Sequence, residues 1–130
     1  MTRDEVQAWL DRYVAAWRSY DPIAIGDLFG TDAEYRYHPW DDDPVSGRDS
    51  IVADWLESPD ATGSWEAHYE PSAVEGDRAS AIGTTRYLNP DGSFSTLYHN
   101  HWTLRFDGDG RCTDFVEYCM ELPERLRPDR

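Results

Sequence analysis

The chain has 130 residues, a formal net charge of −14, and 12 basic residues that are all arginine. This length suits one domain with a single core. So acidic a chain is repelled by nucleic-acid phosphates and by anionic membranes, and we expect neither as a partner.

The first half of the chain predicts three helices and one short strand. TRDE at 2–5 has the spacing of a capping box, and apolar residues then recur at helical spacing. Asp-Pro at 21–22 opens a short helix that is expected to run through Phe29. The strand AEYRYH at 33–38 follows. SGRD at 46–49 has capping-box spacing again and begins the third helix.

After residue 60 the apolar period changes from that of a helix to that of a strand. Turns at EGD, NPDG and DGDG separate four strands. These strands are SWEAHYEPSAV, RASAIGTTRYL, FSTLYHNHWTLRF and RCTDFVEYCMEL. The order of elements predicts an α+β fold, in which helices cover one face of an antiparallel sheet whose strands are long enough to curl. We expect one domain over residues 1–130, with a frayed tail from Pro123.

The expected location is cytoplasmic. The N-terminal MTRDEVQAWL is charged and has no apolar segment of a targeting signal, and no apolar run approaches the length of a membrane span. Cys112 and Cys119 lie seven residues apart on the last predicted strand. Strand alternation points them to opposite faces, so we expect reduced thiols and no disulfide.

Three stretches of the chain are typical of one known superfamily. They are RYVAAW with DPIAIGDLFGTDAEY, HPWDDDPVSGRDSIVADWL, and TLRFDGDGRCTDFVEY. Together they resemble the nuclear transport factor 2-like superfamily, which includes SnoaL-like domains and ketosteroid isomerase, over a core of about residues 5–121. The resemblance implies a cone-shaped α+β barrel, in which a strongly curved sheet wraps around the N-terminal helices and encloses a conical pocket. Because that scaffold carries isomerases, cyclases, dehydratases, hydrolases and binding modules, it implies the fold more than the function.

The resemblance also suggests equivalents for the catalytic groups of ketosteroid isomerase. Those groups are a tyrosine on the first helix, a carboxylate base near the first strand, and a protonated acid on the penultimate strand. By resemblance the tyrosine corresponds to Tyr13, the base to Tyr37 or His38, and the acid to Trp102. Both carboxyl groups are therefore absent, and steroid enolisation by that route is not expected.

His99 and His101 lie one residue apart on the third predicted strand of the second half. If Trp102 faces the cone, strand alternation places Asn100 on the same face and both histidines on the convex face. A metal site there needs further converging ligands, for example His68. We expect cross-strand pairing of these histidines, with no metal and no cofactor.

The same alternation predicts the lining of the pocket. Glu117 faces inward, where a carboxylate is costly unless a partner such as Asn100 or a functional role keeps it. Tyr13 suits either a structural anchor or a hydrogen-bond donor, and the large aromatic residues suit a plain core as well as a binding wall. The candidate catalytic residues are Tyr13, His38 and Glu117. The candidate substrate contacts are Trp17, Tyr37, Trp40, Trp55, Gly83, Thr85, Asn100, Trp102 and Phe115.

Two functions stay open for such a pocket. An aromatic lining with few polar groups favours a small hydrophobic molecule as the ligand. The first function is cofactor-independent acid–base catalysis of the isomerase, cyclase or dehydratase type, with Glu117 or His38 as the base. The alternative is a non-catalytic module that binds a ligand or a protein partner.

The convex face of the predicted sheet indicates a second copy of the chain as a partner. Leu97, Val116 and Tyr118 alternate there with charged residues of both signs. Such a face is more apolar than water-exposed surface needs to be in so acidic a chain. We therefore expect a homodimer through this face.

Overall fold

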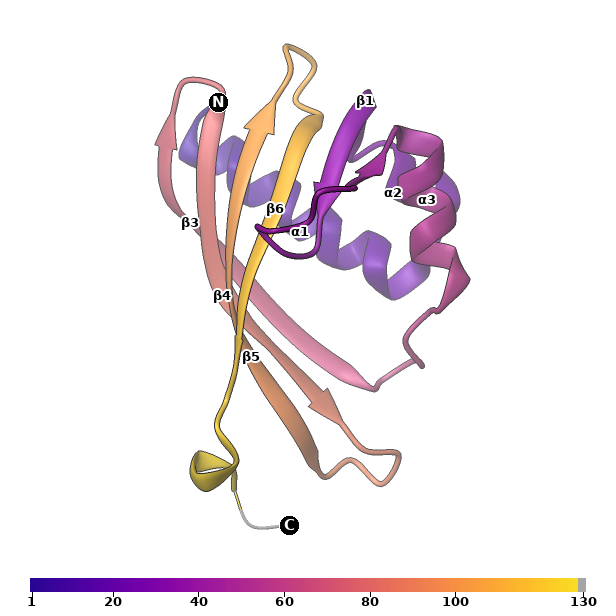
Figure 1. The fold of residues 1–130 in the computed structure, drawn as a ribbon, viewed down its shortest axis with the longest axis vertical. Coiled ribbons are helices and arrows are strands. Elements are labelled where there is room, and N and C mark those ends of the chain that lie inside the picture. The colour runs from indigo at the N-terminus through magenta and orange to yellow at the C-terminus, as the bar shows by residue number, and fades with distance from the viewer. Residues whose placement is uncertain (129–130) are drawn as a thin grey trace.

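The computed structural model of the chain describes residues 1–128. Its helices are α1 (Arg3–Ser19), α2 (Pro22–Gly26), α3 (Arg48–Glu57) and the 3-10 helix η1 (Glu124–Leu126) (Figure 1). Its strands are β1 (Phe29–Arg36), β2 (Val45–Ser46), β3 (Trp65–Glu75), β4 (Arg78–Leu88), β5 (Phe94–Phe106) and β6 (Cys112–Glu121). The predicted order of helices and strands is confirmed, with β2 and η1 as additions.

The strands form one sheet in the order β2-β1-β6-β5-β4-β3. Strands β3 to β6 pair as antiparallel neighbours, whereas β1 and β6 run parallel. The sheet curves around α1, and β2 and β3 form its two edges, so it is open and not a closed barrel (Figure 1). The predicted α+β class and curved sheet are confirmed. The parallel pair and the open edges differ from the predicted antiparallel barrel.

Helix α1 lies inside the curve of the sheet because one of its faces is apolar. Thr2 and Glu5 form the predicted capping box at its start. Its buried face is Val6, Trp9, Leu10, Tyr13 and Ala16. The indole N–H of Trp9 donates to the carbonyl oxygen of Leu28 at 3.0 Å, which ties the helix to the chain just before β1. This contact sets the orientation of α1 and thereby of Tyr13.

Two predicted helix ends differ from the structure. Helix α2 ends at Gly26, and β1 already begins at Phe29. Helix α3 is preceded by Gly47 with φ of 90°, and no side chain caps it. Ser46, the expected cap, belongs to β2 instead. A positive φ is easily adopted only by glycine, so the sharp turn from β2 into α3 replaces the capping box.

The cysteines are both free, but the predicted reason is wrong. A register irregularity between Arg105 and Phe106 pairs Phe106 with Cys112 and turns the Cys112 thiol into the core. Cys119 lies on the concave face as well, so the two do not point to opposite sides. Seven residues of strand separate them by about 23 Å, which prevents a disulfide.

The C-terminal tail contains a short helix. After Pro123 the chain forms η1, and Arg127 donates a hydrogen bond to the Glu121 carboxylate at 2.7 Å. Residues 129–130 of the predicted frayed tail lie outside the described residues. Within the described part of the chain, no helix combines the length and the apolar character needed to span a bilayer.

Candidate functional site

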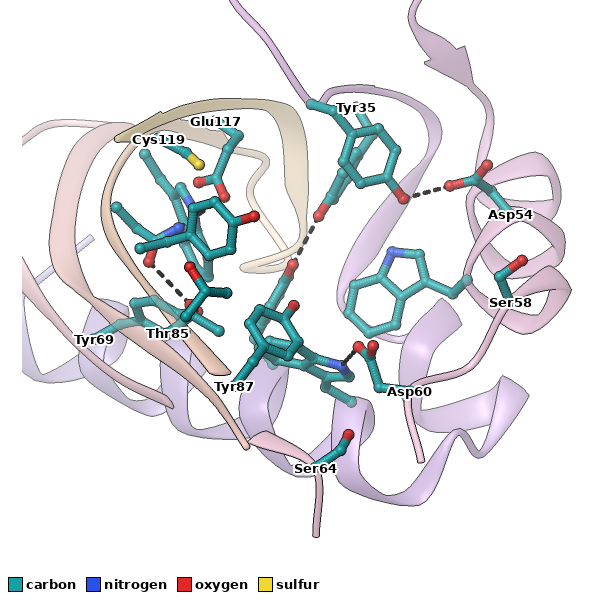
Figure 2. Close-up of a pocket in the computed structure, with 18 of the residues that line it drawn as sticks. Tyr35, Asp54, Ser58, Asp60, Ser64, Tyr69, Thr85, Tyr87, Glu117 and Cys119 are labelled. Carbon is teal, nitrogen blue, oxygen red and sulfur yellow. Dashed lines mark hydrogen bonds between the residues drawn. The ribbon is translucent and has the colours of Figure 1, made fainter. Parts of the chain in front are cut away.

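A cavity of about 900 Å³ opens between α1, α3 and the concave face of the sheet. It is lined by every tyrosine of the chain except Tyr118, together with three tryptophans. In Figure 2, Glu117 and Cys119 lie on one side of it and Asp54, Ser58 and Asp60 on the other. The tyrosines are Tyr13, Tyr20, Tyr35, Tyr37, Tyr69, Tyr87 and Tyr98, and the tryptophans are Trp17, Trp55 and Trp102.

A chain of hydrogen bonds crosses the sheet at the floor of the cavity. Thr85 donates its hydroxyl proton to the side-chain oxygen of Asn100 at 2.9 Å, so Tyr69 is the donor in its short bond to Thr85. Asn100 in turn donates from Nδ2 to Oε1 of Glu117 at 2.9 Å. These bonds set the orientation of the Asn100 amide and hold one oxygen of the Glu117 carboxylate.

The other half of the Glu117 carboxylate has no partner. Glu117 Oε2 and Trp102 Nε1 are both buried, and neither has a hydrogen-bond partner among residues 1–128. Burial raises the pKa of Glu117 to about 7, against the opposing influence of the Asn100 amide and the Trp102 indole. The indole N–H of Trp102 lowers the pKa of Glu117 by its proximity, although the two groups do not have the geometry of a hydrogen bond. At neutral pH Glu117 is therefore present in both protonation states, as a general acid or base requires.

A pair of tyrosine hydroxyls lines the same cavity as this carboxylate. Tyr13 and Tyr35 share a hydrogen bond of 2.7 Å, and burial raises the pKa of both hydroxyls well above their usual value. After burial, the charge of Glu117 adds a smaller increase to the pKa of each hydroxyl. The ring of Phe115 is parallel to both tyrosine rings, with its centroid 4.2 Å from that of Tyr35 and 5.7 Å from that of Tyr13. One bond between two hydroxyls uses one proton, which leaves the other available to a ligand.

The mouth of the cavity is acidic. Tyr37 donates its hydroxyl to Asp54, and the indole N–H of Trp17 donates to Asp60 at 3.0 Å. The backbone N–H of Asp60 donates to the Tyr20 hydroxyl at 2.8 Å. The two carboxylates are therefore held by aromatic side chains that line the same opening.

Most predicted site residues line the cavity. These are Tyr13, Trp17, Tyr37, His38, Trp55, Thr85, Asn100, Trp102 and Glu117. The structure groups Tyr13, Asn100 and Glu117 at the floor but leaves His38 at the mouth. There the His38 ring stacks on Trp40 at 4.9 Å, and its Nδ1 lies 3.4 Å from Asp41.

Three predicted contacts do not line the cavity. Trp40 is 74% exposed, because its ring lies on the surface against His38. Phe115 is buried behind the cavity, where its ring is stacked on that of Tyr35. Gly83 leaves no room for a ligand, because a Cβ on it would collide with the carbonyl oxygen of His68 on β3.

Several lining residues were not predicted as contacts. Tyr35 lies two residues before Tyr37, so the alternation along β1 contained the signal for it. Tyr69 shares the inward parity of β3 in the same way. Asp54 and Asp60 had no such signal, because their positions depend on how α3 and the following loop pack over the cavity.

The histidine pair lies away from the cavity. His99 pairs across the sheet with Thr84, and Thr84 pairs with His68 on β3. His68 and His99 are therefore two strands apart, about 10 Å. His101 is paired with Tyr118, with ring centroids 5.8 Å apart. Within the described residues, no group of three or more histidine, cysteine, aspartate or glutamate side chains is placed to hold a metal ion.

An open curved sheet wrapped around an N-terminal helix, with a cavity between them, is the fold of nuclear transport factor 2-like proteins. The family model of the SnoaL-like domain matches residues 10–115, and the chain belongs to this family. An NTF2-like protein of unknown function from Cytophaga hutchinsonii is similar in structure, with a TM-score of 0.59 and 14% sequence identity. The match covers 88% of this chain and 98% of that protein, and it supports the fold alone. A search of the curated proteins finds no match.

Proposed function

We propose that this protein is a cofactor-independent enzyme that moves a proton on a small hydrophobic molecule bound in the cavity. Glu117 acts as the general base and acid, and the Tyr13–Tyr35 pair donates a hydrogen bond to the substrate. The observation that supports the proposal is the state of Glu117. Its carboxylate has a pKa of about 7 and a free oxygen within a tyrosine-lined cavity.

The reaction needs only these residues. Glu117 Oε2 takes a proton from a carbon next to a substrate carbonyl, and the electron pair of the C–H bond moves into the carbonyl to form an enolate. The enolate oxygen accepts a hydrogen bond from Tyr13 or Tyr35, whose raised pKa values keep them protonated. If the substrate carries a C=C bond next to that carbon, the enolate is a dienolate, and Glu117 returns the proton to its far carbon, which is isomerisation. If the substrate carries a hydroxyl on the β carbon, Glu117 gives the proton to this group as the C–O bond breaks, and it departs as water. Either sequence balances without an oxidant or reductant.

The test is proton exchange on a model ketone. With 2-tetralone in deuterated buffer, the native protein is expected to accelerate exchange of the protons next to the carbonyl, followed by NMR. Glu117→Gln keeps the shape and the bond to Asn100 and is expected to reduce that acceleration by about 10²-fold or more. Glu66→Gln removes a carboxylate from an exposed position on β3 and serves as the matched control.

The second candidate is a non-catalytic module that binds the same class of molecule. It is favoured by the position of His38, which stacks on Trp40 at the mouth and adds no base beside Glu117. The two candidates give different results. Chemical-shift changes that report binding of 2-tetralone, without any acceleration of exchange, would establish the module and reject the enzyme.

A further inference from the structure

The wall of the cavity carries acidic side chains and no arginine among residues 1–128. Asp54, Glu57 and Asp60 line the mouth, and Glu117 lies at the floor. The chain contains no lysine, so His38 is the one lining side chain in this range that can become positive. An anionic ligand would meet like charge without a counter-charge, whereas a cation would meet opposite charge at both ends.

Arginines next to lining residues in the sequence are directed elsewhere. Arg18 follows Trp17 but lies over the ring of Trp65, 5.0 Å from its centroid. Arg36 lies between two cavity tyrosines but pairs with Glu34 at 3.1 Å. The absence of positive charge from the described wall is therefore a property of how the strands and α1 present their residues.

Aromatic rings surround one of these carboxylates. Asp60 accepts the indole N–H of Trp17 and lies beside Tyr20, whose hydroxyl accepts its backbone N–H. Tyr87 lies across from Asp60 in Figure 2, and its pKa is raised first by burial and then by the charge of Asp60. Aromatic rings next to a carboxylate are the arrangement that binds alkylated ammonium groups through cation–π attraction.

Two buried polar atoms of the cavity have no hydrogen-bond partner among residues 1–128. Trp102 is only 2% exposed, and its Nε1 lacks a partner among the described residues, as does Oε2 of Glu117. Buried polar atoms are rarely left unpaired, so two of them in one cavity point to a bound molecule. A molecule whose apolar body lies in this cavity of about 900 Å³ would satisfy these atoms if it carries a polar group, such as a carbonyl, at the Glu117 end.

We propose that the ligand of this cavity carries a positively charged nitrogen, held beside Asp60 among Trp17, Tyr20 and Tyr87, with its hydrophobic part directed toward Glu117. This inference rests on the proposed function in that it specifies the class of molecule bound in the same cavity. Within the class of small hydrophobic molecules, it specifies an amine or a quaternary ammonium compound as the ligand.

The experiment compares two probes of equal shape. Benzyltrimethylammonium is a cation, and neopentylbenzene is its uncharged carbon isostere; binding is followed by tryptophan fluorescence and calorimetry. At low salt the cation is expected to bind about tenfold more tightly than the isostere. Raising the salt from 20 to 300 mM should weaken binding of the cation alone. This measurement on the native protein does not depend on any variant.

Variants locate the charge. Asp60→Asn retains an oxygen for the Trp17 N–H and is expected to weaken cation binding about fivefold while leaving the isostere unchanged. Asp32→Asn removes the same charge from an exposed position on β1 and is expected to change neither. Equal affinity for both probes, or equal losses for both in Asp60→Asn, would overturn the inference and leave a cavity that binds apolar rings. Binding of neither probe at 1 mM would overturn the inference, and exchange on 2-tetralone then decides the proposed function separately.

Discussion

Asn100 on β5 donates a hydrogen bond to Glu117 on β6 at 2.9 Å, although the two residues are not directly opposite each other in the sheet. Asn100 is paired with Cys119, and Glu117 is paired with Trp102. The bond is therefore diagonal, and it leaves the directly paired Trp102 with an unpartnered indole N–H. The Asn100 amide and the Trp102 indole thus flank the Glu117 carboxylate, and only the amide is hydrogen-bonded to it.

The raised pKa of Glu117 predicts a pH-dependent penalty on stability. In the folded state its pKa is about 7, above the ordinary value of 4.5 for a glutamate, so the folded state binds the proton more tightly than the unfolded state. Stability is unaffected below the unfolded pKa, falls as the pH rises from about 4.5 to 7, and is constant above that. A shift of this size corresponds to at most about 3 kcal/mol.

Glu117→Gln removes this titration. The free energy of unfolding of the native chain is expected to fall relative to that of the variant by about 1–3 kcal/mol between pH 4.5 and 8, measured by urea unfolding. Glu66→Gln should follow the native curve. A constant difference between the native chain and Glu117→Gln over this range would show that the carboxylate is not desolvated.

The Tyr13–Tyr35 hydroxyl pair predicts strong coupling. Both side chains are buried, and each hydroxyl has the other as its partner at 2.7 Å. Removing one hydroxyl with Tyr13→Phe or Tyr35→Phe leaves the other unpaired and is expected to cost about 1–3 kcal/mol of unfolding free energy. The double variant is expected to cost clearly less than the sum of the single variants, because no unpaired hydroxyl remains. Additive losses would mean that the pair does not form.

Local alternation explains which parts of the site were predictable. Asn100, Trp102 and Glu117 lie on long regular strands, where the parity of one residue fixes that of its neighbours. The same alternation also predicts Tyr35 as a lining residue, because it lies two residues before Tyr37 on β1, although Tyr35 was not among the predicted contacts. The parallel pairing of β1 with β6 follows from the order of strands in space, and no local pattern encodes it.

At Gly83, the residue type and the face of the strand together gave a wrong prediction of a substrate contact. Gly83 faces the concave side and was predicted as a substrate contact. The space beside it is instead filled by the backbone of His68 and the ring of Tyr69. Curvature brings β3 close over β4 at this point, and a sequence pattern carries no measure of curvature.

This close approach predicts the effect of Gly83→Ala. The added Cβ would meet the His68 carbonyl oxygen, which is backbone and cannot rotate away. We expect a loss of about 1–3 kcal/mol in unfolding free energy, together with a displaced Tyr69 and a weakened bond to Thr85. Gly108→Ala is the control, since no atom lies within 4 Å of its Cβ position, and it should change stability by less than about 0.5 kcal/mol. Equal stability of both variants would contradict the close approach of His68 to Gly83.

The last prediction concerns the convex face, where we propose that two copies of the chain associate. Ile82 is 43% exposed and Met120 76% exposed on this face. Ile82, His101 and Tyr118 form one continuous row across β4, β5 and β6. Burying such a row against its copy would remove apolar surface from water without bringing the acidic mouths of the two cavities together.

Sedimentation at micromolar concentration is expected to give a species of about 30 kDa, twice the 15.0 kDa of one chain. Ile82→Glu places a charge in the middle of the proposed interface and should yield the 15.0 kDa monomer with an intact fold. Ile23→Glu is the matched control, because Ile23 is 73% exposed on α2, away from the sheet, and its replacement should leave the dimer unchanged. A native chain that sediments only as a monomer would remove the dimer. If Ile82→Glu is still a dimer, the interface must lie on another face. A buried, unpaired carboxylate in each copy would prevent association through the convex face.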